Sequence, residues 1–257
     1  MTIQFKESTI FYTDQGTGTP VVFLHGFLEN TSMWDAFMPE LIKKNRVICI
    51  DLLGHGKTEC LGYIHSMELM AGAVEVVLNH LQITKSTLIG HSMGGYVALA
   101  FAEKNPNHIQ GLCLMNSTAL PDTEEKKLNR ERGIAAVKQN YKTFVRIAVS
   151  NLFSPKNKIT FSEKIEIVVN EALKTPLQGI IAALEGMKIR KDRTHILKSS
   201  DFKKMIIISK EDPALDYAST KNQTKNTDTI VVEFPDGHMS HIENESEFFK
   251  TIMHFIE

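Results

Sequence analysis

The chain has 257 residues, of which 42% are hydrophobic and 23% are charged, and its 29 basic and 30 acidic residues give a formal net charge of −1. This length suits one large domain, or one domain that carries an insertion. The balanced charge argues against nucleic acid and against an anionic membrane as partners, since both select a surplus of basic residues.

The cysteines and the N-terminus bear on the cellular compartment. Cys49, Cys60 and Cys113, an odd number, provide neither a disulfide framework nor a C-x-x-C metal pair. Residues 1–6 lack the apolar core of a signal peptide, and no apolar run reaches membrane-spanning length. We therefore expect a cytoplasmic protein in a reducing compartment.

Strand-like and helix-like stretches alternate along the first 117 residues. Period-two patterns predict a hairpin at the start of the chain, and continuous apolar runs predict buried strands after it. Capping residues and apolar periodicity predict the helices between them. The hairpin is expected at 3–5 and 10–13, the strands at 21–24, 46–50, 85–89 and 109–115, and the helices from Ser32, from Ser66 to about 81, and at 96–102. Short connections between such elements predict a parallel sheet with helices on both faces.

The pattern changes between residues 118 and 197, where only helical periodicity is present. Cap helices are expected at 124–151, at 162–174 with Ser162 as its capping residue, and at 176–187. Beyond the cap we expect strands at 204–209 and 229–234, a helix from about 215, and a closing helix at 243–256. We therefore predict an α/β core formed by residues 1–117 and 198–257. Residues 118–197 are predicted to form a helical insertion over the sheet, which we call the cap.

The chain is organised around a Gly-x-Ser-x-Gly motif formed by Gly90, Ser92 and Gly94. It lies between a predicted strand and a predicted helix. A turn this sharp forces the serine into a strained conformation, and glycines two residues away remove the Cβ atoms that would clash. The serine oxygen is then exposed at the N-terminus of a helix, where the dipole favours developing negative charge. Ser92 is the predicted nucleophile.

A serine nucleophile needs a base and a carboxylate that orients the base. His238 follows the last predicted strand, behind Gly237, and is preferred to His241, which we expect in the first turn of the next helix. Asp212 follows the preceding strand and is the predicted acid. Because ligands on an open parallel sheet bind beyond the carboxyl ends of its strands, these loops should meet at Ser92.

The loop after the strand at 21–24 should provide the remaining parts of the site. The backbone N–H groups of Phe27 and Met93 are the expected donors to an oxyanion. The candidates for the substrate pocket are His25, Leu28, His91 and Met239. The His238-x-x-His241 spacing offers no third ligand beyond the nearby Glu243, so neither a metal nor another cofactor is expected.

Together these residues resemble the α/β-hydrolase superfamily. The resemblance rests on His25-Gly26-Phe27, Asp51-x-x-Gly54-His55-Gly56, Gly90-His91-Ser92-Met93-Gly94-Gly95, Asp212 and Gly237-His238, in this order and across residues 10–256. Within it the chain looks like the small-capped branch of carboxylesterases, enol-lactonases and cofactor-free haloperoxidases. Haloalkane dehalogenases and epoxide hydrolases carry Asp at the nucleophile position, so Ser92 argues against both. The resemblance also implies that Arg190, Asp192 and Arg193 make structural salt links.

Three functions follow from this reading. The first is a serine hydrolase that cleaves a small, largely apolar carboxylic ester, lactone or thioester, so that the expected partner is a small-molecule substrate. The second is a triad-dependent lyase resembling the menaquinone-pathway enzyme, in which Arg130, Arg132 and Arg146 would hold substrate carboxylates. The third is a small-ligand receptor of the same fold. The sequence leaves the substrate and the oligomeric state open.

Overall fold

Eight strands form one sheet in the order β1-β2-β4-β3-β5-β6-β7-β8. A computed structural model describes residues 1–199 and 201–257. The strands are β1 (Thr2–Phe5), β2 (Ser8–Gln15), β3 (Thr19–Leu24), β4 (Asn45–Ile50), β5 (Ser86–His91), β6 (Ile109–Met115), β7 (Lys203–Ser209) and β8 (Ile230–Phe234). The pairs β1–β2 and β2–β4 are antiparallel, whereas every other pair is parallel. The predicted mostly parallel sheet and its N-terminal hairpin are confirmed.

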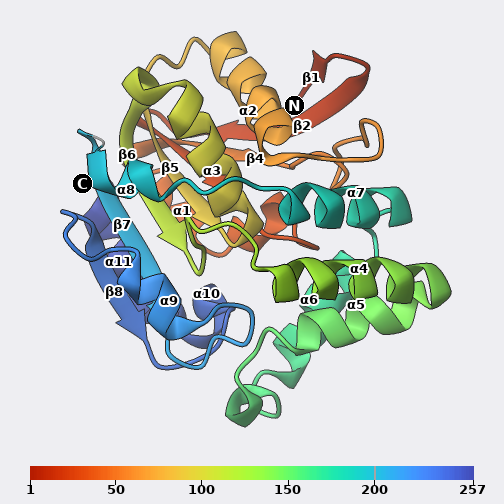
Figure 1. Cartoon of the computed structure of the whole chain (residues 1–257). Helices are drawn as coiled ribbons and strands as arrows, with labels where there is room; N and C mark the ends of the chain where they lie inside the picture. Colours follow the sequence, from red (N-terminus) through yellow and green to blue (C-terminus); the bar gives the residue numbers. More distant parts are fainter. Residues whose placement is uncertain (200) are drawn as a thin grey trace.

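Helices cover both faces of this sheet (Figure 1). On one face α2 (Met67–His80) and α3 (Met93–Lys104) pack on residues such as Val22 and Leu88. On the other face α1 (Met38–Leu41) and α11 (Glu245–Ile256) pack on Cys49 and Cys113. Each central strand is therefore apolar on both sides, as its continuous hydrophobic run requires.

The cap consists of α4 (Glu124–Gln139), α5 (Tyr141–Ser150), α6 (Ser162–Ala172) and α7 (Leu177–Lys188). These four helices lie together beside the core in Figure 1. The chain returns to the sheet through α8 (Thr194–Ser199), which packs on α3. The predicted cap boundary at residue 198 therefore falls inside α8.

Three predicted helices are interrupted. The stretch 124–151 breaks at Asn140, which leaves helical geometry and whose side chain caps Thr143 N–H. The helix expected from Ser32 is instead η1 (Thr31–Trp34), capped by Asn30, followed by the short α1. The closing helix is split into α10 (Ser240–Glu243) and α11. Asparagine competes for backbone hydrogen bonds and so favours such breaks, which apolar periodicity does not register.

Two further predicted helix starts differ in detail. The helix α6 is preceded by Phe161, so Ser162 is its first residue and not its cap. The helix α9 (Tyr217–Asn222) begins two residues later than expected, behind Asp216, whose side chain accepts from Ser219 N–H. In contrast, Ser66 caps α2 as predicted, through a bond from Leu69 N–H.

Among residues 1–199 and 201–257, no single helix is long and apolar enough to cross a membrane. The pair α6 and α7 meets the same criteria of length and composition only when the two are taken together, and they are bent by 98°.

Candidate active site

Ser92 lies at the turn between β5 and α3. Its backbone has φ of 49° and ψ of −113°, which is a left-handed conformation that a residue with a Cβ rarely adopts. A Cβ on Gly90 would lie 2.5 Å from the Gly94 carbonyl oxygen, and a Cβ on Gly94 would lie 2.3 Å from the Leu24 carbonyl oxygen. Glycine is thus required at both positions, and the strained serine turn has the geometry of a nucleophile elbow.

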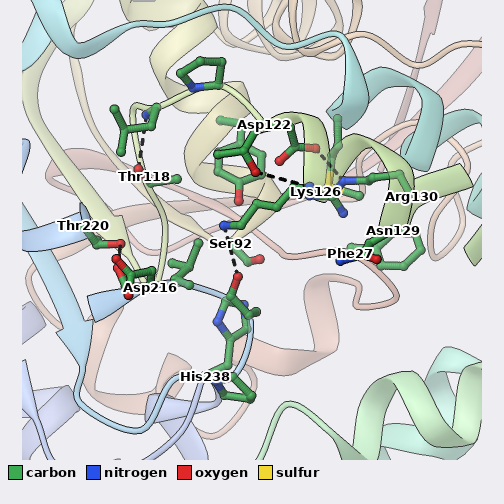
Figure 2. A pocket seen from close by; sticks show the side chains of 18 of the residues that line it. Phe27, Ser92, Thr118, Asp122, Lys126, Asn129, Arg130, Asp216, Thr220 and His238 are labelled. Atoms are coloured by element: carbon green, nitrogen blue, oxygen red, sulfur yellow. Dashed lines mark hydrogen bonds and ion pairs between the residues drawn. The ribbon is translucent and has the colours of Figure 1, made fainter. Parts of the chain in front are cut away.

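His238 and Asp212 meet beside this turn. His238 Nδ1 lies 2.8 Å from Asp212 Oδ2 and 2.9 Å from Oδ1. Both side chains are buried, and His238 lines the same cavity as Ser92 (Figure 2). Because Asp212 engages Nδ1, the other ring nitrogen, Nε2, is the one that can take up a proton.

Asp212 is surrounded by hydrogen-bond donors. Burial alone would raise the pKa of its carboxyl, but His238, the Asn116 amide and backbone N–H groups lower the pKa below its usual value. Asn116 Nδ2 donates to Asp212 Oδ2 at 3.1 Å, and the N–H groups of Ala214 and Leu215 donate to Oδ1. The carboxylate is therefore kept ionised beside the imidazole.

The ring of the rival base His241 packs against Trp34 and His91 and has no hydrogen bond to Asp212 among the described residues. It is buried in α10, and burial lowers the pKa of its imidazole to about 3. The position directly after β6 holds Asn116. Its φ is 43°, and its amide also donates to Ser209. Asn116 thus connects the ends of β6 and β7 at the site.

The loop after β3 presents Phe27 to the cavity. His25 Nε2 accepts from Leu52 N–H at 2.9 Å, so the ring proton lies on Nδ1, which donates to the Gly26 carbonyl at 2.7 Å. In a trans peptide the C=O and the following N–H point in opposite directions. Fixing the Gly26 carbonyl therefore fixes the direction of the Phe27 N–H group.

Met93 supplies the second candidate donor. It is the first residue of α3, and the first amides of a helix have no carbonyl partner within the helix. Phe27 lies in the loop after β3, whereas Met93 directly follows Ser92 at the start of α3. Their role as oxyanion donors stays a prediction from the sequence.

A buried ion pair joins these loops. His91 Nδ1 lies 2.6 Å from Glu29 Oε2, and the same oxygen accepts from Gly26 N–H at 2.7 Å. On its other side, His91 Nε2 lies 3.2 Å from the His238 carbonyl oxygen. The His91 imidazole thus connects three segments: the loop after β3, the turn at Ser92, and the loop that carries His238.

These residues open into a cavity of about 870 Å³ between the core and the cap. One part of its wall is apolar and includes Phe27, Tyr96, Phe144, Leu184 and Met187. Another part is charged and includes Asp122, Lys126, Arg130 and Asp216 (Figure 2).

The four expected pocket residues are placed differently from one another. His91 lines the cavity, whereas His25, Leu28 and Met239 are absent from its wall. His25 is buried and hydrogen-bonded to Gly26 and Leu52. Leu28 lines a separate cavity of about 220 Å³, and Met239 is buried in the core. The structure differs here from the expectation because neighbouring side chains along a loop point to different sides of it.

The arginines of the cap segment are paired. Arg190 and Arg130 both bind Asp122, at 2.5 and 2.8 Å, and the Asp122 carboxyl is fully buried. Arg193 binds Glu68 and Glu103 across to α2 and α3. These salt links agree with the structural role implied for Arg190 and Arg193.

Asp192 caps α8. Its Oδ1 accepts from the N–H and hydroxyl of Thr194, the first residue of α8, and it forms no salt link with any of the described residues. The expectation of a salt link at Asp192 is therefore not met by the hydrogen bonds in the structure.

One group of buried side chains could offer ligand atoms to a metal ion. Those of Glu29, His91 and His241 lie within 4.8 Å of one another. The sequence spacing had drawn attention to His238 and His241, and only the second belongs to this group. Glu29 and His91 are already hydrogen-bonded to each other.

Three residues that contact the candidate site are not identified by the sequence patterns. Glu29 and Asn116 act through partners 62 and 96 residues away, so no local pattern identifies them. Glu243 accepts from the N–H groups of Ser154 in the cap and Gly237 next to His238, and so joins the cap to the loop of the base. Only Asn116 carries a sequence signal, since it is a polar residue directly after the buried strand β6.

Comparison with known proteins covers most of the chain. The sequence model of the alpha/beta hydrolase fold family matches residues 19–245. A solved structure of a thermophilic esterase from Thermogutta terrifontis, with malate bound, is 30% identical, with a TM-score of 0.87 over 96% of this chain and 92% of that one. The enol-lactonase of Burkholderia xenovorans LB400 has a TM-score of 0.91 at 20% identity over 99% of both chains, which supports the fold alone.

The curated relatives match over shorter stretches. The 2-hydroxymuconate semialdehyde hydrolase of Pseudomonas sp. (strain CF600) is 35% identical over 117 residues, which are 43% of this chain and 41% of that protein. The dihydrolipoyllysine-residue acetyltransferase component of the acetoin cleaving system of Pseudomonas putida is 38% identical over 103 residues, 40% of this chain and 28% of that protein. The chain thus matches less than half the length of these relatives. From the family match and the strained serine turn together, we conclude that the chain belongs to the α/β-hydrolase family.

Proposed function

We propose that the protein is a serine hydrolase that cleaves a small carboxylic ester, lactone or thioester. The observation that carries this proposal is the placement of Ser92, in a strained turn, on the same cavity as His238, whose Nδ1 is held by the buried Asp212. This is the arrangement that activates a weak hydroxyl nucleophile. The esterase from Thermogutta terrifontis, at 30% identity, supports the same reaction class.

In the proposed reaction Ser92 Oγ attacks the ester carbonyl carbon while its proton moves to His238 Nε2. The carbonyl oxygen becomes an oxyanion, which the N–H groups of Phe27 and Met93 stabilise. Collapse of this intermediate breaks the bond to the alcohol oxygen, which takes the proton from His238. Water then attacks the acyl-enzyme, gives a proton to His238, and releases the acid and Ser92.

Asp212 orients the base throughout this sequence. Its bond to Nδ1 selects the tautomer with Nε2 free to accept a proton, and its charge stabilises the imidazolium that forms. The apolar wall formed by Phe27, Tyr96, Phe144 and Leu184 suits the hydrocarbon part of an acyl group.

The lyase alternative has less support. Arg132 and Arg146 lie at the surface and bind Asn129 and Glu166. Arg130 reaches the cavity, but it is paired with Asp122 (as above). The three arginines therefore offer no unpaired cluster for a polyanionic substrate. The receptor alternative has less support as well, because a receptor without turnover would not require a serine next to a base.

The test compares Ser92→Ala with the exposed cap variant Ser162→Ala. We expect the first to lose hydrolysis of p-nitrophenyl butyrate by about 10⁶-fold and to lose labelling by a fluorophosphonate probe. The second should keep both. Equal labelling of wild type and Ser92→Ala, or an unchanged rate, would refute the proposal.

A further inference from the structure

One cation on the cavity wall, Lys126, forms no ion pair with a carboxylate of the described residues. Lys126 lies in the first turn of α4 and lines the same cavity as Ser92 and His238. Figure 2 shows its side chain extending from the cap towards the loop after β7, which carries Asp212 and Ala214. Among the described residues its Nζ donates one hydrogen bond, to the Ala214 carbonyl at 3.3 Å.

The carboxylates around Lys126 are otherwise engaged. Asp122 is bound by two arginines, as described above. Asp216 accepts from Ser219 and caps α9, and Asp192 accepts from Thr194 and caps α8. Glu125, the fourth acidic residue on the wall, is exposed. None of the four forms an ion pair with Lys126 within the described residues.

The charge of Lys126 is held at a position that disfavours it. It lies near the positive end of the helix dipole of α4, and Arg130 follows four residues later on the same helix face. Burial, and after it the charge of Arg190, lower the pKa of its ammonium group. The carboxylates of Asp122 and Asp212 offset this effect only in part, and a bound anion would stabilise the ammonium further.

We propose that Lys126 binds a carboxylate of the substrate, so that the preferred esters are half-esters of short dicarboxylic acids. In this arrangement the ester carbonyl lies at Ser92, the methylene groups contact the apolar wall, and the distal carboxylate accepts a charge-assisted hydrogen bond from Lys126 Nζ. The inference rests on the proposed hydrolase function and specifies its substrate class.

The kinetic test uses the monomethyl and dimethyl esters of succinic, glutaric and adipic acid. The two esters of each acid share the scissile bond and differ in the distal charge. For at least one chain length we expect wild type to have the higher kcat/KM on the monoester. Lys126→Met should reduce that value about tenfold or more, mainly through KM, and leave the diester within about twofold, since a hydrogen bond to a charged group contributes roughly 1.5–3 kcal/mol.

The matched control is Lys127→Met. Lys127 is the next residue of α4, is paired with Glu124, and is absent from the cavity wall. It should leave both ester classes unchanged. Equal loss in Lys126→Met and Lys127→Met, or an unchanged preference in Lys126→Met, would overturn the carboxylate site.

A binding measurement separates this inference from the proposed function. The Ser92→Ala variant cannot cleave by the proposed route, so its affinity for intact monomethyl glutarate is measurable by calorimetry or ligand-detected NMR. We expect tighter binding of the monoester than of dimethyl glutarate, and loss of the difference in Ser92→Ala/Lys126→Met. If no ester is turned over by wild type, the hydrolase proposal fails, and this measurement still decides the role of Lys126.

Discussion

His91 and Glu29 form a buried pair that requires a charged imidazole. His91 Nδ1 lies 2.6 Å from the Glu29 carboxylate, and Nε2 lies 3.2 Å from the His238 carbonyl oxygen. Both neighbours are hydrogen-bond acceptors, so both ring nitrogens must carry a proton. Burial alone would lower the pKa of His91, but the charge and hydrogen bond of Glu29 raise it above its usual value. The pair thus keeps a charged imidazole between the loop after β3 and the loop that carries the candidate base His238.

The first prediction concerns pH and stability in Glu29→Gln. Because the folded-state pKa of His91 is raised, its contribution is fully present below the ordinary histidine pKa of about 6.5 and is lost as pH rises through the raised value. Without Glu29, burial lowers the pKa of His91, and this loss on the alkaline side disappears. The variant should be less stable by about 3–5 kcal/mol at pH 6, measured by urea unfolding.

The same variant has an effect on the acidic side. Burial would raise the pKa of Glu29, but His91 lowers it to about 2, so its contribution is present above the ordinary glutamate pKa and fades as pH falls towards 2. The control is Glu40→Gln, at an exposed residue, which should leave both the acidic and the alkaline side of the stability–pH curve unchanged. Identical stability–pH curves for Glu29→Gln and wild type would contradict the charged pair.

The second prediction tests the orienting carboxylate. In Asp212→Asn the amide would still reach His238 Nδ1 but could stabilise the wrong tautomer, so kcat should fall by about 10⁴-fold with little change in folding. The neighbouring variant Glu211→Gln is the control, because Glu211 binds Ser154 and Lys156 and not His238. Similar losses in both variants would argue against Asp212 as the acid.

The sequence predicts the sheet and its loops well, because the strands are continuous apolar runs that are bounded by clear turn residues. The predicted strand 109–115 coincides with β6, and the hairpin and parallel order follow from alternation and short connections. Cap helices are less well predicted. Their apolar faces continue across Asn140, so the break between α4 and α5 depends on one side-chain cap that periodicity does not detect.

The candidate site likewise contains residues that the sequence predicts and residues that it does not. Ser92, Asp212 and His238 are identifiable because each follows a strand in a fixed order, and the structure brings them together. Glu29 and Asn116 are not identifiable, because their roles come from contacts between distant loops. The charge environment of the cavity is also a tertiary property, since it depends on which cap side chains pair with one another.

The third prediction concerns Asn116. In Asn116→Ala, Asp212 loses the amide donor at 3.1 Å, and Ser240 Oγ loses its acceptor. The pKa of Asp212 should then rise, since that hydrogen bond favours the ionised form. We expect kcat/KM to fall about tenfold, from a lost hydrogen bond to a charged group, and its acidic limb to move to higher pH. A uniform loss with an unshifted limb would assign Asn116 a packing role only.

The last prediction is a double-mutant cycle on the cap salt link. The side chains of Asp122 and Arg190 are 0% and 2% exposed, so Asp122→Asn leaves a buried guanidinium unpaired and should cost about 3–5 kcal/mol in urea unfolding. In Asp122→Asn/Arg190→Met that charge is gone, while Arg130, at 21% exposure, can reach water. The double variant should therefore recover part of the loss, because a pair removed as a whole leaves no buried charge.

The control is Lys191→Met, which removes an exposed pair with Glu68 and should change stability by less than about 1 kcal/mol. Strictly additive losses at Asp122 and Arg190 would show that the two residues contribute independently and that the salt link does not join the two ends of the cap segment.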